Sequence, residues 1–292
     1  MIDQDFPDPD LLQVGTAYYA YATNSAGANI QVARSDDLVE WHVDGDALPI
    51  LPAWANPGNT WAPEVSAFAD DMYVMYFTAR HAASGRQCIG AASSTEPRGP
   101  FTAVGAEPLI CQLDLGGSID AAVFDDDGTR YVLWKNDGNC CGADTWLYLQ
   151  PLSADGLALL GEPLQLIKQD QAWEGRLIEA PTLWKQAGRY FLFYSANSYT
   201  GLDYAVGYAV ADTIAGPYTK ADAPLLVSDL EGGAAFGPGG QDIVVSDDGE
   251  TWLVYHSWDP TVTYRRMQLD ELRWQDGVPV VDGPDLEPQP AP

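Results

Sequence analysis

Polar residues recur along the chain, each followed about ten residues later by an apolar run with two aromatic residues three positions apart. They are Asp8, Glu64, Asp120, Glu179 and the pair Gln241–Asp242. Carboxyl groups that are buried close together repel one another, so that some hold a proton while others stay ionised. If these residues converge, they can supply a general acid and a general base from one residue type.

The aromatic pairs mark the elements that must position these carboxyl groups. They are Tyr18/Tyr21, Tyr73/Tyr76, Tyr131/Trp134, Tyr190/Phe193 and Trp252/Tyr255, and they begin 55, 58, 59 and 62 residues apart. Each module continues with a second apolar run, a turn rich in Gly-Pro or Asp-Gly, and a short outer strand. Modules of this length with three or four short strands are typical of propeller blades. We therefore expect an all-β, five-bladed β-propeller, and the alternative is a β-sandwich with accidental spacing.

Length and composition are consistent with one such domain. A chain of 292 residues can form a single all-β domain, and 28 Gly and 21 Pro favour short strands with tight turns. We expect residues 1–292 to form one catalytic domain, of which residues 285–292 are an exposed tail. The sequence contains no run of eighteen apolar residues, so we do not expect a membrane span. Residues 1–5 lack the features of a secretory signal, so the protein is expected to be cytoplasmic or to have lost a leader.

The charge excludes some classes of partner. A net charge of −28 with only 14 basic residues argues against nucleic acid and against anionic membranes, since both need Lys and Arg. We expect a monomer with a solvated acidic surface. The four cysteines are Cys88, Cys111, Cys140 and Cys141, none in a C-x-x-C pair. Buried thiols are the first expectation, and a bridge from Cys140 or Cys141 to a distant loop is the alternative, because adjacent cysteines are poorly placed to bond to each other.

The first strand of each propeller blade lines the central channel, so residues at its start face one funnel. We therefore expect the recurring polar residues to occupy the same position in each blade. Carboxyl groups on blades across a funnel can lie roughly 6.5–9.5 Å apart, the separation used by inverting glycosidases. Pro7 and Pro9 flank Asp8, whereas Asp120 and Glu179 have apolar neighbours. Burial favours the neutral form of a carboxyl group, which is the form that a proton donor needs.

Four ordered motifs make the chain similar to glycoside hydrolase family 43. They are Phe6-Pro7-Asp8-Pro9, Trp61-Ala62-Pro63-Glu64, Ser118-Ile119-Asp120 and Ile178-Glu179-Ala180-Pro181. The resemblance covers essentially the whole chain and implies a five-bladed propeller that hydrolyses arabinose- or xylose-containing plant polysaccharides with inversion. It implies that Asp8 is the general base, Glu179 the general acid, and Asp120 the residue that tunes and orients the acid.

The resemblance also implies an Arg and a His near the site, and the sequence adds two further candidate residues, Trp61 and Glu64. An Arg of the last blade should lie near the reactive sugar, and Arg265 is preferred over Arg266. His256 is expected beside a calcium ion or a water cluster in the channel, or else as a hydrogen-bonded core residue. Trp61 is the candidate sugar platform, since aromatic rings are usual in that role. Glu64 either binds a substrate hydroxyl or pairs within the barrel. No organic cofactor is expected.

The leading hypothesis for function is an exo-acting α-L-arabinofuranosidase. A β-xylosidase is the first alternative and an endo-1,5-α-arabinanase the second, because loops around the funnel set specificity and are poorly read from one sequence. A carbohydrate-binding propeller without catalysis is the alternative of a different class.

Overall fold

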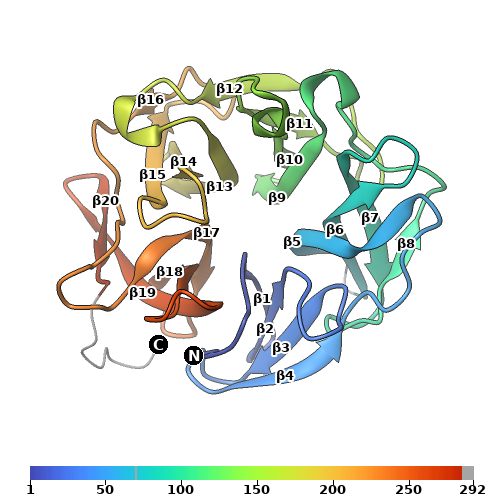
Figure 1. Ribbon diagram of the computed structural model, residues 1–292, viewed down its shortest axis with the longest axis horizontal. Coiled ribbons are helices and arrows are strands. Elements are labelled where there is room, and N and C mark those ends of the chain that lie inside the picture. Colours follow the sequence, from blue (N-terminus) through green and yellow to red (C-terminus); the bar gives the residue numbers. More distant parts are fainter. Residues whose placement is uncertain (70, 285–292) are drawn as a thin grey trace.

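The computed structural model describes residues 1–69 and 71–284, in which five four-stranded antiparallel sheets form a ring (Figure 1). The fold is an all-β, five-bladed β-propeller, as predicted. The predicted tail, residues 285–292, lies outside the described residues.

The strands follow the chain from the inside of each blade to its outside. Blade 1 contains β1 (Asp10–Val14), β2 (Ala17–Ala22), β3 (Gln31–Ser35) and β4 (Trp41–Asp46). Blade 2 contains β5 (Ala55–Ala69), β6 (Met72–His81), β7 (Gln87–Ser94) and β8 (Thr102–Val104). Blade 3 contains β9 (Ser118–Asp126), β10 (Thr129–Asn136), β11 (Trp146–Pro151) and β12 (Leu164–Lys168). Blade 4 contains β13 (Ile178–Gln186), β14 (Arg189–Ala196), β15 (Ala205–Ala211) and β16 (Thr219–Lys220). Blade 5 contains β17 (Phe236–Val245), β18 (Thr251–Trp258), β19 (Arg265–Gln275) and β20 (Val278–Asp282).

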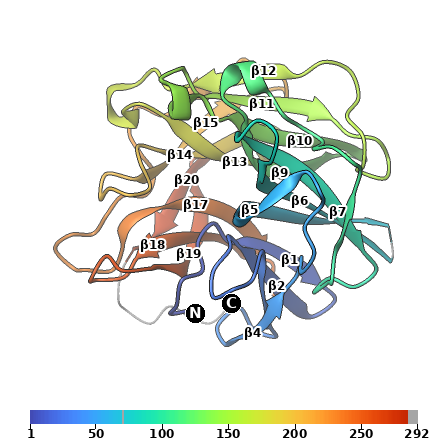
Figure 2. The ribbon, with the colours of Figure 1, turned by 45° about the vertical axis from the view of Figure 1, so that its right-hand side comes forward.

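The innermost strands β1, β5, β9, β13 and β17 surround the centre of the ring, also in the turned view of Figure 2. Helical structure in the described residues consists of the 3-10 turns η1 (Leu113–Leu115), η2 (Gly138–Cys141) and η3 (Ala172–Glu174). No helix in residues 1–69 and 71–284 has the length and apolar character needed to cross a membrane.

The aromatic pairs lie on the second strand of each blade and hold neighbouring blades together. Residues three apart on a strand point to opposite faces. Tyr18 therefore packs with Trp252 between blades 1 and 5, whereas Tyr21 packs with Tyr73 between blades 1 and 2. One aromatic residue of each pair thus reaches each neighbouring blade.

The aromatic repeat is not in the same register in every blade. Tyr21 pairs with Asp10 of the innermost strand, and Tyr76 pairs in the same way with Glu64. In blade 3, however, Leu133 takes this place opposite Ala122, and the aromatic pair is shifted by one residue. The same shift occurs in blade 5, where Val254 pairs with Asp242. A shift of one residue moves a side chain to the other face of the sheet.

The N-terminal segment closes the ring against blade 5. The backbone N–H of Phe6 donates to the carbonyl of Arg265 at 2.8 Å, and that of Met267 donates to the carbonyl of Ile2 at 3.2 Å. These bonds place Asp8, which follows directly, beside the start of β19.

The expectation of free cysteines is wrong for this structure, which contains two disulfides, Cys88–Cys111 and Cys140–Cys141. An antiparallel bridge between Ile89 and Ile110 brings the first pair together, with Cα atoms 4.7 Å apart. The second pair is adjacent in sequence and lies at the end of η2. The sequence did not indicate this bond because adjacent cysteines rarely join.

Candidate active site

Each blade has a residue with a small positive φ in its innermost strand or two residues before it. These residues are Asp8, Ala62, Asp120, Ala180 and Gly240, with φ between 39° and 58°. In β5, β9, β13 and β17 the pairing register slips around this residue, as at a β-bulge. Such a bulge redirects the side chains beside it, and a non-glycine residue at positive φ is uncommon.

The predicted polar residues therefore do not share one position, and that part of the prediction is wrong. Asp8 and Asp120 occupy the positive-φ position itself. Glu179 lies one residue before it, whereas Glu64 and Asp242 lie two residues after it. The sequence spacing could not show this, because the bulges change the pairing without changing the length of the repeat.

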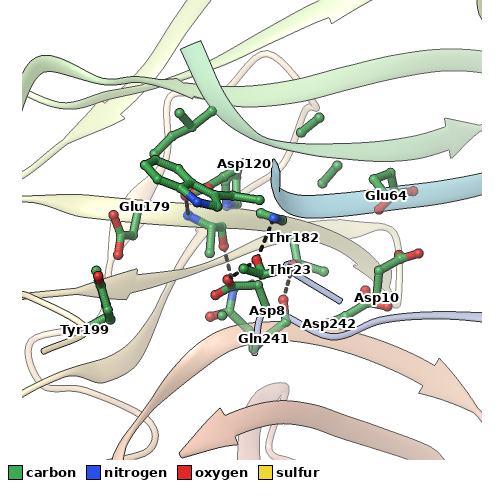
Figure 3. A pocket seen from close by; sticks show the side chains of 18 of the residues that line it. Asp8, Asp10, Thr23, Glu64, Asp120, Glu179, Thr182, Tyr199, Gln241 and Asp242 are labelled. Atoms are coloured by element: carbon green, nitrogen blue, oxygen red, sulfur yellow. Dashed lines mark hydrogen bonds between the residues drawn. The ribbon is translucent and has the colours of Figure 1, made fainter. Parts of the chain in front are cut away.

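The predicted catalytic and substrate-binding residues nevertheless line one cavity of about 400 Å³. These residues are Asp8, Trp61, Glu64, Asp120, Glu179 and Arg265. Figure 3 shows Asp8, Asp120 and Glu179 on one side and Glu64 with Asp10 and Asp242 on the other. The cavity thus contains two clusters of carboxyl groups. The first is the predicted catalytic set, and the second, called here the inner carboxyl cluster, consists of Asp10, Glu64 and Asp242.

Asp8 is surrounded by groups that favour its ionised form. Thr23 Oγ1 donates to Asp8 Oδ2 at 2.6 Å, and Arg265 donates to Oδ1 at 3.4 Å. His256 Nδ1 lies 3.2 Å from Asp8 Oδ1. Burial opposes ionisation, but the Arg265 charge and the contacts with His256 and Thr23 hold the pKa of Asp8 well below its usual value. An ionised carboxylate is the form that a general base needs.

Asp120 and Glu179 lie on the neighbouring inner strands β9 and β13. Asp120 Oδ2 accepts a hydrogen bond of 2.9 Å from the backbone N–H of Ala180, which follows Glu179. Burial and the charge of Glu179 raise the pKa of Asp120 to about 8. Asp120 is therefore mainly protonated at neutral pH, next to the residue predicted to be the acid.

Two residues that sequence reasoning missed hold the Glu179 carboxyl group. Tyr204 donates from its hydroxyl to Glu179 Oε1 at 2.8 Å. Lys135 donates from Nζ to Glu179 Oε2 at 3.0 Å, and its side chain is fully buried. A lysine at the end of the apolar run of β10 was the available signal, because a buried lysine needs a carboxylate partner.

Of the two candidate arginines, Arg265 lines the cavity and Arg266 does not. Arg266 donates instead to the carbonyl of Ala234 at 3.0 Å. The Arg265 guanidinium lies 4.6 Å from the centre of the Tyr199 ring, a cation–π contact. Tyr199 is partly exposed and also lines the cavity, so it is an aromatic wall that the sequence did not indicate. Trp61, the predicted platform, lines the cavity from β5 and is half-buried.

The inner carboxyl cluster is held in place by backbone hydrogen bonds. Asp10 accepts a hydrogen bond from the backbone N–H of Val65, and Asp242 accepts one from that of Leu11, both at 2.9 Å. Burial and mutual repulsion raise the pKa of Asp10 well above its usual value. Burial, with the charge of Asp242, raises the pKa of Glu64 to about 7, and burial raises that of Asp242 to about 6.

The surroundings of His256 do not fit ligation of calcium by its imidazole. Its Nδ1 lies 3.1 Å from the backbone nitrogen of Asp8, and its Nε2 lies 3.4 Å from the Arg265 guanidinium. The ring is fully buried and stacks on Tyr204 with centroids 5.8 Å apart. Burial and the Arg265 charge lower the pKa of His256, so the ring is neutral. Calcium binding stays a prediction.

The family model described as "Glycosyl hydrolases family 43" matches residues 1–279. A β-D-galactofuranosidase of Aspergillus niger is 29% identical, over 86% of this chain and 73% of that enzyme. An α-L-arabinofuranosidase of Humicola insolens is 30% identical over 78% of this chain, which spans only 51% of that enzyme.

Solved structures are similar to this chain over nearly its full length. A thermostable family-43 glycoside hydrolase superposes with a TM-score of 0.89 and 35% identity, covering 99% of this chain and 96% of that one. An endo-1,4-β-xylanase from Bacteroides thetaiotaomicron superposes with a TM-score of 0.83 and 30% identity, covering 97% of both chains. The chain therefore belongs to glycoside hydrolase family 43, whose enzymes act by inversion.

Proposed function

We propose that this enzyme is an exo-acting α-L-arabinofuranosidase in which Asp8 is the general base and Glu179 the general acid. The observation that carries the proposal is the contrast between the two residues in one cavity. Asp8 is held ionised by Arg265, His256 and Thr23, whereas Glu179 lies beside Asp120, whose own raised pKa keeps Asp120 protonated at neutral pH.

In this mechanism Glu179 gives its proton to the glycosidic oxygen while the bond from that oxygen to the anomeric carbon breaks. Asp8 takes a proton from a water molecule that attacks the anomeric carbon from the opposite face. One water is consumed, the new C–O bond has inverted configuration, and the leaving sugar departs as an alcohol. Asp120 is a positioning residue, since it accepts from the backbone next to Glu179 and shares its charge environment.

The size of the cavity supports exo action. About 400 Å³ is near the lower end of the roughly 300–1,000 Å³ typical of ligand pockets. The two enzymes matched by sequence above are furanosidases, which supports a five-membered sugar ring over the xylopyranose of a β-xylosidase. The structural neighbour described as an endo-1,4-β-xylanase is the observation on the other side. The β-xylosidase and endo-arabinanase activities remain the alternatives.

Hydrolysis of 4-nitrophenyl α-L-arabinofuranoside and 4-nitrophenyl β-D-xyloside at equal enzyme concentration tests the proposal. We expect the higher kcat/KM on the arabinofuranoside and β-arabinose as the first product by NMR. Inactivity on both substrates, together with release of oligosaccharides from linear arabinan, would show an endo-arabinanase instead.

The Glu179→Gln variant tests the acid. It should lose about 10²–10⁴-fold in kcat on substrates whose leaving group needs a proton, while still binding arabinose in a calorimetric titration. A variant with full activity would disprove the assignment.

A further inference from the structure

Lys135 is the buried cation closest to the proposed acid. Its side chain has no exposed surface, and Nζ lies 3.0 Å from Glu179 Oε2 and 2.7 Å from Asn139 Oδ1. Asp137 Oδ1 is 4.0 Å away. Burial disfavours the charged form, but Glu179, Asp120 and Asp137 outweigh it and raise the pKa of Lys135 above its usual value. The side chain is therefore an ammonium ion.

We propose that Lys135 is a positioning residue for the acid step, which it serves by fixing the Glu179 carboxyl group and stabilising the carboxylate that remains after proton transfer. This inference rests on the proposed role of Glu179 as the acid. The proton leaves Glu179 for the glycosidic oxygen, and the negative charge that appears on Glu179 lies 3.0 Å from the ammonium group. In a buried site such a charge is costly unless it is paired.

The neighbouring strands β9 and β11 and the turn η2 position Lys135. It lies near the end of β10, paired with Ile119 of β9 and Leu147 of β11. Asn139 belongs to η2, the turn that follows β10 and lines the cavity. Lys135 thus connects the strand next to Asp120, the turn at the rim and the acid on β13.

Charged and titratable groups face Glu179 from several strands. They are Lys135 on β10, Asp120 on β9, Asp137 after β10, Tyr204 before β15 and His256 on β18, with Asp8 and Arg265 lining the same cavity. Lys135 is the cation of this set in contact with Glu179, while Arg265 contacts Asp8. Loss of Lys135 should therefore affect the acid and leave the base largely unchanged.

The substitution Lys135→Met removes the charge at similar length. The proton is then held more tightly by Glu179, so the alkaline limb of kcat/KM should move to higher pH by about one unit. The rate should fall by about 10–100-fold on methyl α-L-arabinofuranoside, whose leaving group needs a proton. It should fall by less than about 3-fold on the 4-nitrophenyl glycoside, whose leaving group departs readily without one.

Two lysine variants serve as controls. Lys185→Met removes a lysine on the same strand as Glu179 that pairs with Asp126 and Asp127 away from the cavity, and it should change neither substrate preference nor pH profile. Lys135→Arg keeps the charge and should restore the alkaline limb towards that of the unmodified enzyme. If Lys135→Met does not fold, Asn139→Ala replaces it, since it removes the 2.7 Å contact of the ammonium. This variant should lose about 3–10-fold on the methyl glycoside and less on the nitrophenyl one.

Equal losses on the two glycosides with an unmoved alkaline limb would overturn the inference and assign Lys135 a purely structural role. Glu179→Gln, measured on the same pair, separates this result from failure of the proposed function. If Glu179→Gln shows the substrate-dependent loss and the variants of Lys135 or Asn139 do not, only the role of Lys135 is wrong. If Glu179→Gln shows no such dependence, Glu179 is not the acid. The same design applies with xylosides if those are the better substrates.

Discussion

The inner carboxyl cluster should make the stability of the folded protein depend on pH in an unusual way. Asp10, Glu64 and Asp242 lie together on one side of the cavity, and the charge of Asp242 adds to burial in raising the pKa of Glu64 from 4.5 to about 7. Glu64→Gln removes one ionisable group with little change in size. We expect this variant to remove part of the loss of stability that the enzyme undergoes between mildly acidic and neutral pH.

The raised pKa of Glu64 determines whether the protein gains or loses stability as pH rises. The folded protein holds the Glu64 proton more tightly than the unfolded chain, so the unfolded state releases this proton first as pH rises. The stabilisation by neutral Glu64 is complete below about pH 4.5 and lost as pH approaches 7. At about 1.36 kcal/mol per pKa unit, the shift corresponds to roughly 3 kcal/mol. Glu64→Gln should therefore gain roughly 3 kcal/mol relative to the unmodified protein between pH 4.5 and pH 7.5.

Urea unfolding at several pH values, in the presence of EDTA so that no divalent cation screens the carboxylates, measures this difference. Glu162→Gln, which changes an exposed carboxyl group, is the matched control and should show a difference that does not vary with pH. A free-energy difference between Glu64→Gln and the unmodified protein that stays constant from pH 4.5 to 7.5 would refute the reasoning. Glu64 would then be ionised in the fold, with a partner that compensates its charge.

Three further variants test the surroundings of Asp8. The 2.6 Å hydrogen bond from Thr23 helps to lower the pKa of Asp8, and Thr23→Val removes it, so the acidic limb of kcat/KM should move to higher pH by at most about one unit. Arg265→Leu should move the same limb upward and reduce kcat/KM by roughly 100-fold, whereas an unmoved limb in steady-state assays would place Arg265 outside the base's environment. Tyr199→Ala should raise KM by about 3–10-fold without lowering the thermal midpoint, since its ring lies on the Arg265 guanidinium at the partly exposed cavity wall, and an unchanged KM would contradict that role.

The predicted site residues differ in how much of their environment the sequence could indicate. The apolar neighbours of Asp120 and Glu179 indicated that these side chains would be buried, and Pro7 and Pro9 indicated a restricted backbone at Asp8. The positive φ at Asp8 and Asp120 was not visible, because the sequence shows no glycine there to signal a bulge. The prediction of one common position failed for this reason.

The sequence by itself determined the number of blades and the family, because every blade must bury two faces and therefore repeats its apolar and aromatic residues. It also determined that carboxyl groups would gather at the centre of the ring. Only the tertiary structure decided that Lys135 contacts Glu179, 44 residues away, and that Arg265 rather than Arg266 faces the cavity. The physical reason is register, because a bulge or a slip of one residue turns a side chain to the opposite face and leaves the sequence spacing almost unchanged.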